Sequence, residues 1–331
     1  MDYKIVRLPL GKTMYSTFHD EGTGGIALAN NPSGYNWYLN DVMNLNCIRG
    51  FVNTFTSPLV RIANASFWDN PNFEIVYHLI DFGEKNIHRK IKRLLDMGYY
   101  VYFSGIDDFY IPGKSWYKER HFDHDGTIFG YDDVNKTYNI FAYNKSWIYT
   151  SFTIPQRSFV QGLHSRHHYV EYATLNGVKA KNEQVELDIP KIKKGITEYL
   201  DSSWYKYPPN IDAPVYGIVV HDYISMYMYK LISNAFPHNR IDRRIYRTIW
   251  EHKNVMLQRI EAVEKKLGWE NEISCKYKPI ESEANLLRMM YASYVIKPKY
   301  HIMEALRDRI LILREKEQDV LEAFINSLKE Y

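Results

Sequence analysis

The fold is decided by residues 121–144, which read HFDHDGTIFGYDDVNKTYNIFAYN. Two parts of this stretch, residues 126–131 and 138–143, are rich in Tyr, Phe and Ile, which favour β-strands. The residues between them, 132–136, include two aspartates and an asparagine, side chains typical of a hairpin turn. The stretch therefore predicts two antiparallel strands joined by a short turn.

Further strands are expected on both sides of this hairpin. Residues 73–80, 99–105 and 147–154 are short runs rich in aromatic and β-branched side chains. Residues 85–97, between the first two runs, are predicted to form a helix. This half of the chain is therefore expected to combine helices with an antiparallel sheet.

An early segment, residues 35–63, carries apolar side chains spaced by three and four positions, which is typical of an amphipathic helix. These side chains are Val42, Leu45, Ile48, Val52 and Phe55. The pattern predicts that Cys47 lies on this helix, in or near its first turns.

The C-terminal part of the chain has mainly helical periodicity. Residues 185–189 are a candidate strand, and Pro190 is suited to open a helix that runs to about residue 202. Two long apolar stripes follow, the first ending at Gly268 and the second beginning after Pro298. We therefore expect an α+β protein, with a catalytic domain over residues 1–165 and a mainly helical C-terminal domain or lid over residues 166–331.

Composition excludes several classes of protein. A chain of 331 residues with a net charge of +3 lacks the one-signed field that nucleic acid or an anionic membrane selects. No stretch is long and apolar enough to span a membrane, and the N-terminal residues lack the apolar core of a secretion signal. We therefore expect a cytoplasmic protein that binds neither nucleic acid nor membranes.

Two cysteines, Cys47 and Cys275, are too few for a disulfide framework or a zinc site built from cysteine. No cofactor or metal is predicted, because the histidines and aspartates lack the spacing of strong metal motifs. The groups considered were His121, Asp123, His124 and Asp125, and His164, His167 and His168.

One thiol is sufficient for nucleophilic catalysis when an imidazole and a helix N-terminus stabilise its thiolate. Cys47, followed in the chain by His124 and by a polar residue after the next strand, has the order of a papain-like site. The alternatives are that Cys47 is a buried core thiol and that His124 is a hydrogen-bonded surface histidine.

The chain resembles a family at three short motifs: DDFYIPG at residues 107–113, HFDHDGTIFGYDD at 121–133 and TYNIFAYN at 137–144. They resemble the papain-like, C39-related cysteine acyltransferases of the butirosin-biosynthesis type, found in bacterial natural-product gene clusters. The resemblance implies a papain-like core, in which an antiparallel sheet packs on an N-terminal helix headed by the nucleophilic cysteine. It also implies a catalytic histidine six residues before a Gly-Tyr-Asp turn.

Carried to this sequence, the resemblance implies Cys47 as the nucleophile and His124 as the general base. The third catalytic position falls at Tyr143 or Asn144, and Asn144 is the candidate that would orient the imidazole. A Cys-His dyad with no third member fits the same residues. Tyr143 is then a candidate for the substrate pocket.

The oxyanion hole departs from the pattern of the family. Asp41 stands where the family has a glutamine, and an ionised carboxylate cannot donate a hydrogen bond. Asn40 and Asn44 are the nearest candidates to donate in its place.

The function that the resemblance implies is amide-bond formation in natural-product biosynthesis. Cys47 would take an acyl group from the phosphopantetheine thioester of an acyl or peptidyl carrier protein, and a small amine would resolve the acyl-enzyme. One alternative is hydrolysis, by a cysteine peptidase or thioesterase. The other is a catalytically silent papain-like module that binds a peptide or a carrier protein.

Basic clusters are the candidate surfaces for an acidic carrier protein. The alternative is that each cluster is an ordinary solvated face. The clusters comprise Arg89, Lys90, Lys92 and Arg93, and Arg240, Arg243, Arg244 and Arg247.

Overall fold

A seven-stranded antiparallel sheet and a group of long helices form the two units of the protein. The computed structural model describes residues 4–52, 56–204, 214–233 and 241–329. The sheet unit comprises Met1–Tyr35 and Ser66–Gln184, and the helical unit comprises Asn36–Ala65 and Val185–Tyr331. The α+β class is therefore confirmed, whereas the predicted boundary between residues 165 and 166 does not match these units.

The strands of the large sheet are hydrogen-bonded in the order β4-β9-β5-β6-β7-β8, and β1 pairs with the C-terminal end of β6. Their bounds are β1 (Ile5–Arg7), β4 (Phe73–Ile80), β5 (Tyr100–Asp107), β6 (Asp123–Asp132), β7 (Thr137–Tyr143), β8 (Tyr149–Pro155) and β9 (Ala173–Ala180). The predicted hairpin is confirmed as β6 and β7. Its turn forms because the Asp132 carboxylate accepts hydrogen bonds from the backbone N–H groups of Val134 and Asn135.

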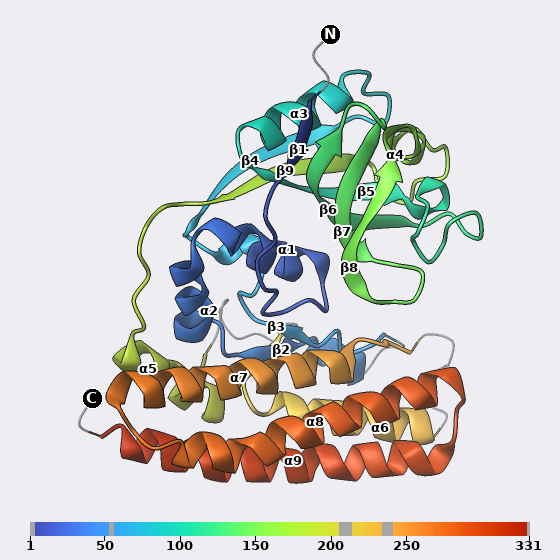
Figure 1. Ribbon diagram of the computed structural model, residues 1–331. Coiled ribbons are helices and arrows are strands. Elements are labelled where there is room, and N and C mark those ends of the chain that lie inside the picture. The colour runs from blue at the N-terminus through green and yellow to red at the C-terminus, as the bar shows by residue number, and fades with distance from the viewer. Residues whose placement is uncertain (1–3, 53–55, 205–213, 234–240, 330–331) are drawn as a thin grey trace. The chain divides into compact units, whose positions relative to one another are not determined.

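Helices cover both faces of this sheet (Figure 1). On one face lie α3 (Ile87–Asp96) and α4 (Gln156–Leu163), and their apolar side chains join those of the strands in the main core. On the other face lies α1 (His19–Ala27), whose Thr23 hydroxyl is 2.6 Å from that of Thr127 on β6.

Small residues let α1 approach the sheet closely. A Cβ atom placed on Gly22 would lie 2.4 Å from the hydroxyl of Tyr149, so any larger side chain would push the helix away. The close approach brings the first turn of α1 to the ends of β6, β7 and β8.

The helical unit contains α2 (Tyr35–Asp41), α5 (Ile189–Leu200), α6 (Val220–Ile232), α7 (Ile245–Leu267), α8 (Glu272–Ile296) and α9 (Tyr300–Ser327). Helix α9 packs against α6 and α8, and α8 packs against α7 (Figure 1). A small antiparallel sheet, in the order β10-β2-β3, is formed by β2 (Leu45–Cys47), β3 (Arg61–Ile62) and β10 (Val215–Tyr216). Gly268 ends α7 in the left-handed conformation, as predicted.

The helix predicted over residues 35–63 is wrong. Helix α2 ends at Asp41, where the buried guanidinium of Arg259 donates to the carbonyls of Tyr38, Leu39 and Val42. At a helix end the last carbonyls lack intrahelical partners, and Arg259 satisfies those of Leu39 and Val42. The Tyr38 carbonyl accepts from Arg259 and also from the Val42 N–H. Leu45–Cys47 then forms a strand, and residues 53–55 lie outside the described part of the chain.

The strand predicted over residues 185–189 is wrong, because residues 185–188 form no regular secondary structure and residue 189 belongs to a helix. Helix α5 begins at Ile189 with Pro190 in its first turn, as expected, and the Asp188 side chain caps it by accepting from the Lys191 backbone N–H. Among the residues that the structure describes, no helix is both long and apolar enough to cross a membrane.

Candidate functional site

His124 is held by a buried carboxylate at the start of β6. A register shift between Phe103 and Ile106 brings Ile106 opposite His124, so the 3₁₀ turn that follows β5 (Asp108–Tyr110) lies beside the imidazole. The Asp108 Oδ2 atom is 2.8 Å from His124 Nδ1. In the tautomer whose Nδ1 donates to this carboxylate, Nε2 carries the lone pair.

The side chain of His124 remains 22% exposed, whereas that of Asp108 is 2% exposed. Within the described residues, Nε2 of His124 makes no hydrogen bond. The site therefore presents an oriented imidazole with an available basic nitrogen, which is the arrangement of a general base.

A buried lysine completes the charge balance. Lys114 is inaccessible to solvent, and its Nζ atom is 3.4 Å from Asp108 Oδ1 and 3.0 Å from the Asp125 carbonyl oxygen. The ammonium also lies 3.1 Å from His124 Nδ1, which accepts from it in the tautomer that carries the proton on Nε2. Lys114 thus neutralises Asp108 and fixes the carboxylate that orients His124.

A second histidine, His19, is the first residue of α1 and is buried beside His124. The two imidazole rings meet edge to face, with centroids 4.8 Å apart. Nε2 of His19 accepts from the backbone N–H of Tyr143 at 3.4 Å, so Nδ1 carries the proton. Burial, assisted by the nearby charges of His124 and Lys114, holds the pKa of His19 well below its ordinary value.

Aromatic and acidic side chains surround this pair of histidines. The rings of Tyr143 and Tyr149 contact His19 at centroid distances of 5.4 and 5.5 Å. The Asp125 carboxylate accepts from the hydroxyl of Tyr102 at 2.9 Å, and burial raises the pKa of Asp125. The site is thus a largely desolvated group of polar side chains around two imidazoles.

Asn144, the candidate to orient His124, has other partners. Its side-chain oxygen accepts from the backbone N–H groups of Ser146 and Ile148 and stabilises the loop between β7 and β8. Asp108 makes the contact with His124 instead. Tyr143, the candidate pocket residue, lies in the site through its backbone N–H and its ring.

Cys47 lies in the helical unit, whereas His124 lies in the sheet unit. It is a buried strand residue that pairs with Val215, so the predicted helical position is wrong. Burial raises the pKa of the Cys47 thiol and only a weak effect of Arg49 opposes the rise, so the thiolate is strongly disfavoured. A nucleophilic role for Cys47 stays a prediction, and its surroundings do not supply the activation that such a role needs.

Asn40 and Asn44, the candidate oxyanion donors, are also in the helical unit, where both border a hollow. Cys275 is exposed and lies within α8.

The histidines considered as metal ligands have other partners. His121 Nδ1 is 2.7 Å from Asp107 Oδ2, and His168 Nδ1 is 2.6 Å from Asp123 Oδ1. Over the described ranges, no three His, Cys, Asp or Glu side chains are grouped as metal ligands would be.

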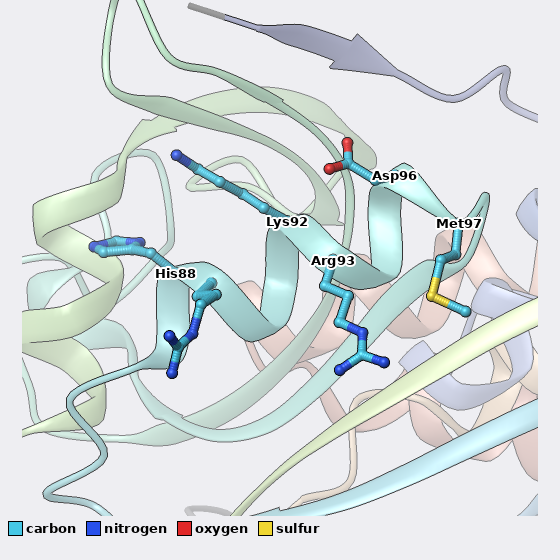
Figure 2. Close-up of a pocket in the computed structure, with 6 residues that line it drawn as sticks. His88, Lys92, Arg93, Asp96 and Met97 are labelled. Carbon is cyan, nitrogen blue, oxygen red and sulfur yellow. The ribbon is translucent and has the colours of Figure 1, made fainter. Parts of the chain in front are cut away.

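The first basic cluster lies on α3. It borders an open hollow of about 640 Å³ lined by His88, Arg89, Lys92, Arg93, Asp96 and Met97, most of which are labelled in Figure 2. Lys92 pairs with Asp133, whereas Arg89 and Arg93 are exposed and make no ion pair within the described residues.

In the second cluster, Arg244 pairs with Asp242 and Arg247 with Glu251. Arg240 lies outside the described residues.

Sequence reasoning missed Asp108, Lys114 and His19. The first two belong to the run DDFYIPGK at residues 107–114, which carries part of the family resemblance, so its two aspartates were a usable signal. His19 precedes the small-residue run GTGGIA, which marks a helix that packs closely.

Compared with known proteins, the chain matches no protein-family model and no curated protein sequence.

Proposed function

We propose that the sheet unit has a papain-like core and that it transfers an acyl group from a thioester to an amine, with His124 as the general base. The observation that carries the proposal is the 2.8 Å contact between His124 Nδ1 and the buried carboxylate of Asp108, which leaves Nε2 available. The acyl chemistry comes from the family resemblance. The first turn of α1 at the histidine of β6 supports the papain-like arrangement.

The mechanism differs from that of a cysteine enzyme, because the residue that begins α1 is His19 and not a thiol. The amine nitrogen attacks the thioester carbonyl carbon directly, and its proton passes to Nε2 of His124. The carbon–sulfur bond then breaks, and the leaving thiolate takes the proton back from the imidazolium. Asp108 holds the required tautomer and stabilises the imidazolium while it exists.

His19 is suited to stabilise the developing oxyanion. Its imidazole is neutral because its pKa is lowered by burial, and its Nδ1–H is a donor that no other described residue uses. The N–H of a neutral imidazole donates a hydrogen bond to the carbonyl oxygen and does not release its proton to solvent.

The basic face of α3 supports a carrier protein as the acyl donor. Arg89 and Arg93 are one helical turn apart and exposed, so they are available to acidic residues of a docked partner. An acyl donor carried on an acidic carrier protein would dock there through charge.

The test measures amide formation from a short acyl-pantetheine thioester and a primary amine. The reaction is monitored by the release of free thiol and by the mass of the product. A general base contributes about 10²–10⁴-fold, so His124→Gln should lower the rate at least about 100-fold, and Asp108→Asn should lower it in the same direction. Cys47→Ala should leave the rate unchanged, and the intact protein should carry no acyl adduct.

The matched control is His121→Gln. His121 also contacts an aspartate through Nδ1 and is 27% exposed, but it lies outside the proposed site. Its loss should not change the rate. An acyl adduct on Cys47, or full activity in His124→Gln, would show that the mechanism is wrong.

A second candidate function is the silent binding module, and the ring of His19 favours it. This ring lies against His124 at the position where the resemblance places the nucleophile. A module of this kind would bind the acylated carrier without releasing thiol, and His124→Gln would not alter that binding. Hydrolysis, the other alternative, predicts the same thiol release whether or not the amine is present.

A further inference from the structure

Strand β4 forms one edge of the large sheet, and no strand among the described residues pairs with its outer side. On its inner side it pairs with β9 over eight consecutive residues, from Phe73 to Ile80. In an antiparallel strand, alternate residues direct their backbone N–H and C=O groups to opposite sides. Every second residue of β4 therefore presents backbone hydrogen-bonding groups at the outer edge, where another strand can pair with them.

This edge lacks the features that usually keep edge strands from pairing. Residues 73–80 read FEIVYHLI and contain no lysine, arginine or proline. The register with β9 has no shift, so no bulge twists the edge away from an incoming strand. Tyr77 and Leu79 are 50% and 56% exposed, and the ring of the half-exposed Trp68 lies 6.1 Å from that of Tyr77. A long, regular and partly apolar edge of this kind is suited to pair with a strand of another molecule.

The sequence of β4 is complementary to itself in one register. When two copies pair antiparallel about a two-fold axis and keep their sheet faces aligned, the axis passes through one residue. With Val76 on the axis, Glu74 of one copy faces His78 of the other, and Ile75 faces Tyr77. An imidazole N–H donates to a carboxylate, and a β-branched side chain opposite an aromatic ring is a favourable cross-strand pair. Because of the symmetry, each of these pairs occurs twice.

The neighbouring registers lack this match. With Tyr77 on the axis, Glu74 would face Ile80, which is buried in the main core. With Ile75 on the axis, Glu74 would face Val76, which also packs against that core. An aliphatic side chain offers no hydrogen bond to a carboxylate, so the charge pattern selects the register through Val76.

Glu74 and His78 can form this pair without losing other partners. Glu74 is exposed, and one of its carboxylate oxygens accepts from the hydroxyl of Tyr99, which leaves the second oxygen for the imidazole. His78 is partly exposed and makes no hydrogen bond through its side chain in the described part of the chain.

We propose that two copies of this chain pair through β4, antiparallel about a two-fold axis at Val76, so that their large sheets form one continuous sheet. The interface is isologous, because the same residues contribute to it from both copies. It is independent of the acyl-transfer proposal, since no residue of the His124 site takes part.

The experiment is analytical ultracentrifugation of the full-length protein over a range of concentrations. A dimer should form with a Kd of about 100 µM or lower, within the range of small interfaces. His78→Glu places two carboxylates opposite each other in both symmetric pairs, so it should raise the Kd at least about tenfold. Adding Glu74→Lys to His78→Glu makes the facing charges opposite again, so the Kd should return to within about threefold of the native value.

The matched control is Thr153→Glu. It adds the same charge at an exposed position of β8, the strand at the other edge of the sheet, and should leave the Kd unchanged. If His78→Glu fails to fold by circular dichroism, Tyr77→Lys decides, because a lysine on the exposed face of the edge should also weaken the pairing about tenfold.

Three outcomes overturn the proposal. The first is a protein that stays monomeric at about 100 µM. The second is a folded His78→Glu or Tyr77→Lys protein that dimerises as tightly as the native chain, which would place the dimer on another surface. The third is a double variant that dimerises as weakly as His78→Glu, which would show that Glu74 does not face His78.

Discussion

Replacing Glu317 by glutamine should destabilise the helical unit by several kcal/mol. Glu317 on α9 and Lys253 on α7 form an ion pair at 2.6 Å in which both side chains are wholly inaccessible to solvent. The carboxylate also accepts from the hydroxyls of Tyr199 at 2.9 Å and Tyr277 at 2.5 Å. One carboxylate therefore connects side chains from four helices.

The magnitude follows from the charge that the substitution leaves behind. The amide oxygen of glutamine still accepts from a tyrosine hydroxyl, but it cannot neutralise Lys253. Breaking a buried ion pair by removing one partner costs about 3–5 kcal/mol, so Glu317→Gln should lower the free energy of unfolding by that amount. Tyr277→Phe is the smaller matched change, because it removes one hydrogen bond to the carboxylate and should cost about 1.5–3 kcal/mol.

The loss of unfolding free energy in Glu317→Gln, called the deficit below, should depend on pH. Burial lowers the pKa of Lys253 and Glu317 raises it, so removing Glu317 lets that pKa fall further. A folded-state pKa below the unfolded value of about 10.4 means that the unfolded chain binds more protons, so stability rises with pH. The deficit should therefore be largest near pH 7 and shrink toward pH 9.5.

The assay is guanidinium denaturation of the full-length protein, followed by circular dichroism at 222 nm, at both pH values. The double variant Glu317→Gln with Lys253→Met should recover most of the loss, because it removes the unpaired charge. A loss below about 1 kcal/mol in Glu317→Gln, or a double variant less stable than either single one, would refute this account of the network.

Two further predictions concern stability. His19, His221 and His252 are buried, and burial is the main cause that holds each pKa well below its ordinary value. Because the unfolded chain binds their protons first, stability should fall as pH drops below about 6.5, by up to about 1.4 kcal/mol per pH unit for each histidine, which denaturation midpoints between pH 5 and 8 would check. Gly268→Ala should lower the free energy of unfolding by about 1 kcal/mol, because the φ of 68° at this helix cap is unfavourable for alanine. The added Cβ meets no neighbour, so no steric cost is added. Gly268→Asn should cost less, and thermal unfolding would compare the two variants.

Local periodicity predicted the elements whose side chains pack on neighbours in a regular repeat. The run at 73–80 is β4 with the predicted bounds, and the stripe that ends at Gly268 is α7. The segment 35–63 failed because its apolar residues are buried by long-range pairing. Cys47 pairs with Val215, and α2 ends where Arg259 binds its carbonyls. Both interactions join residues far apart in the sequence, so the local spacing of apolar residues could not predict them.

The candidate site divides in the same way. His124 was found because it stands on a regular strand with many polar neighbours. Its partner was missed because the choice between two adjacent aspartates depends on the register shift in β5. After that shift, Asp107 meets His121 and Asp108 meets His124, so one added residue in the strand decides which imidazole each carboxylate orients.

The two neighbouring imidazoles of the sheet unit have different surroundings, and their proposed roles follow from this difference. His19 is buried, no carboxylate among the described residues is hydrogen-bonded to its ring, and burial holds its pKa low, which favours a neutral imidazole. His124 is partly exposed and rests on Asp108, so a positive charge formed on its ring is stabilised where it arises. In the proposed mechanism no thiolate is required, because one histidine would accept the proton of the attacking amine while the other would polarise the carbonyl.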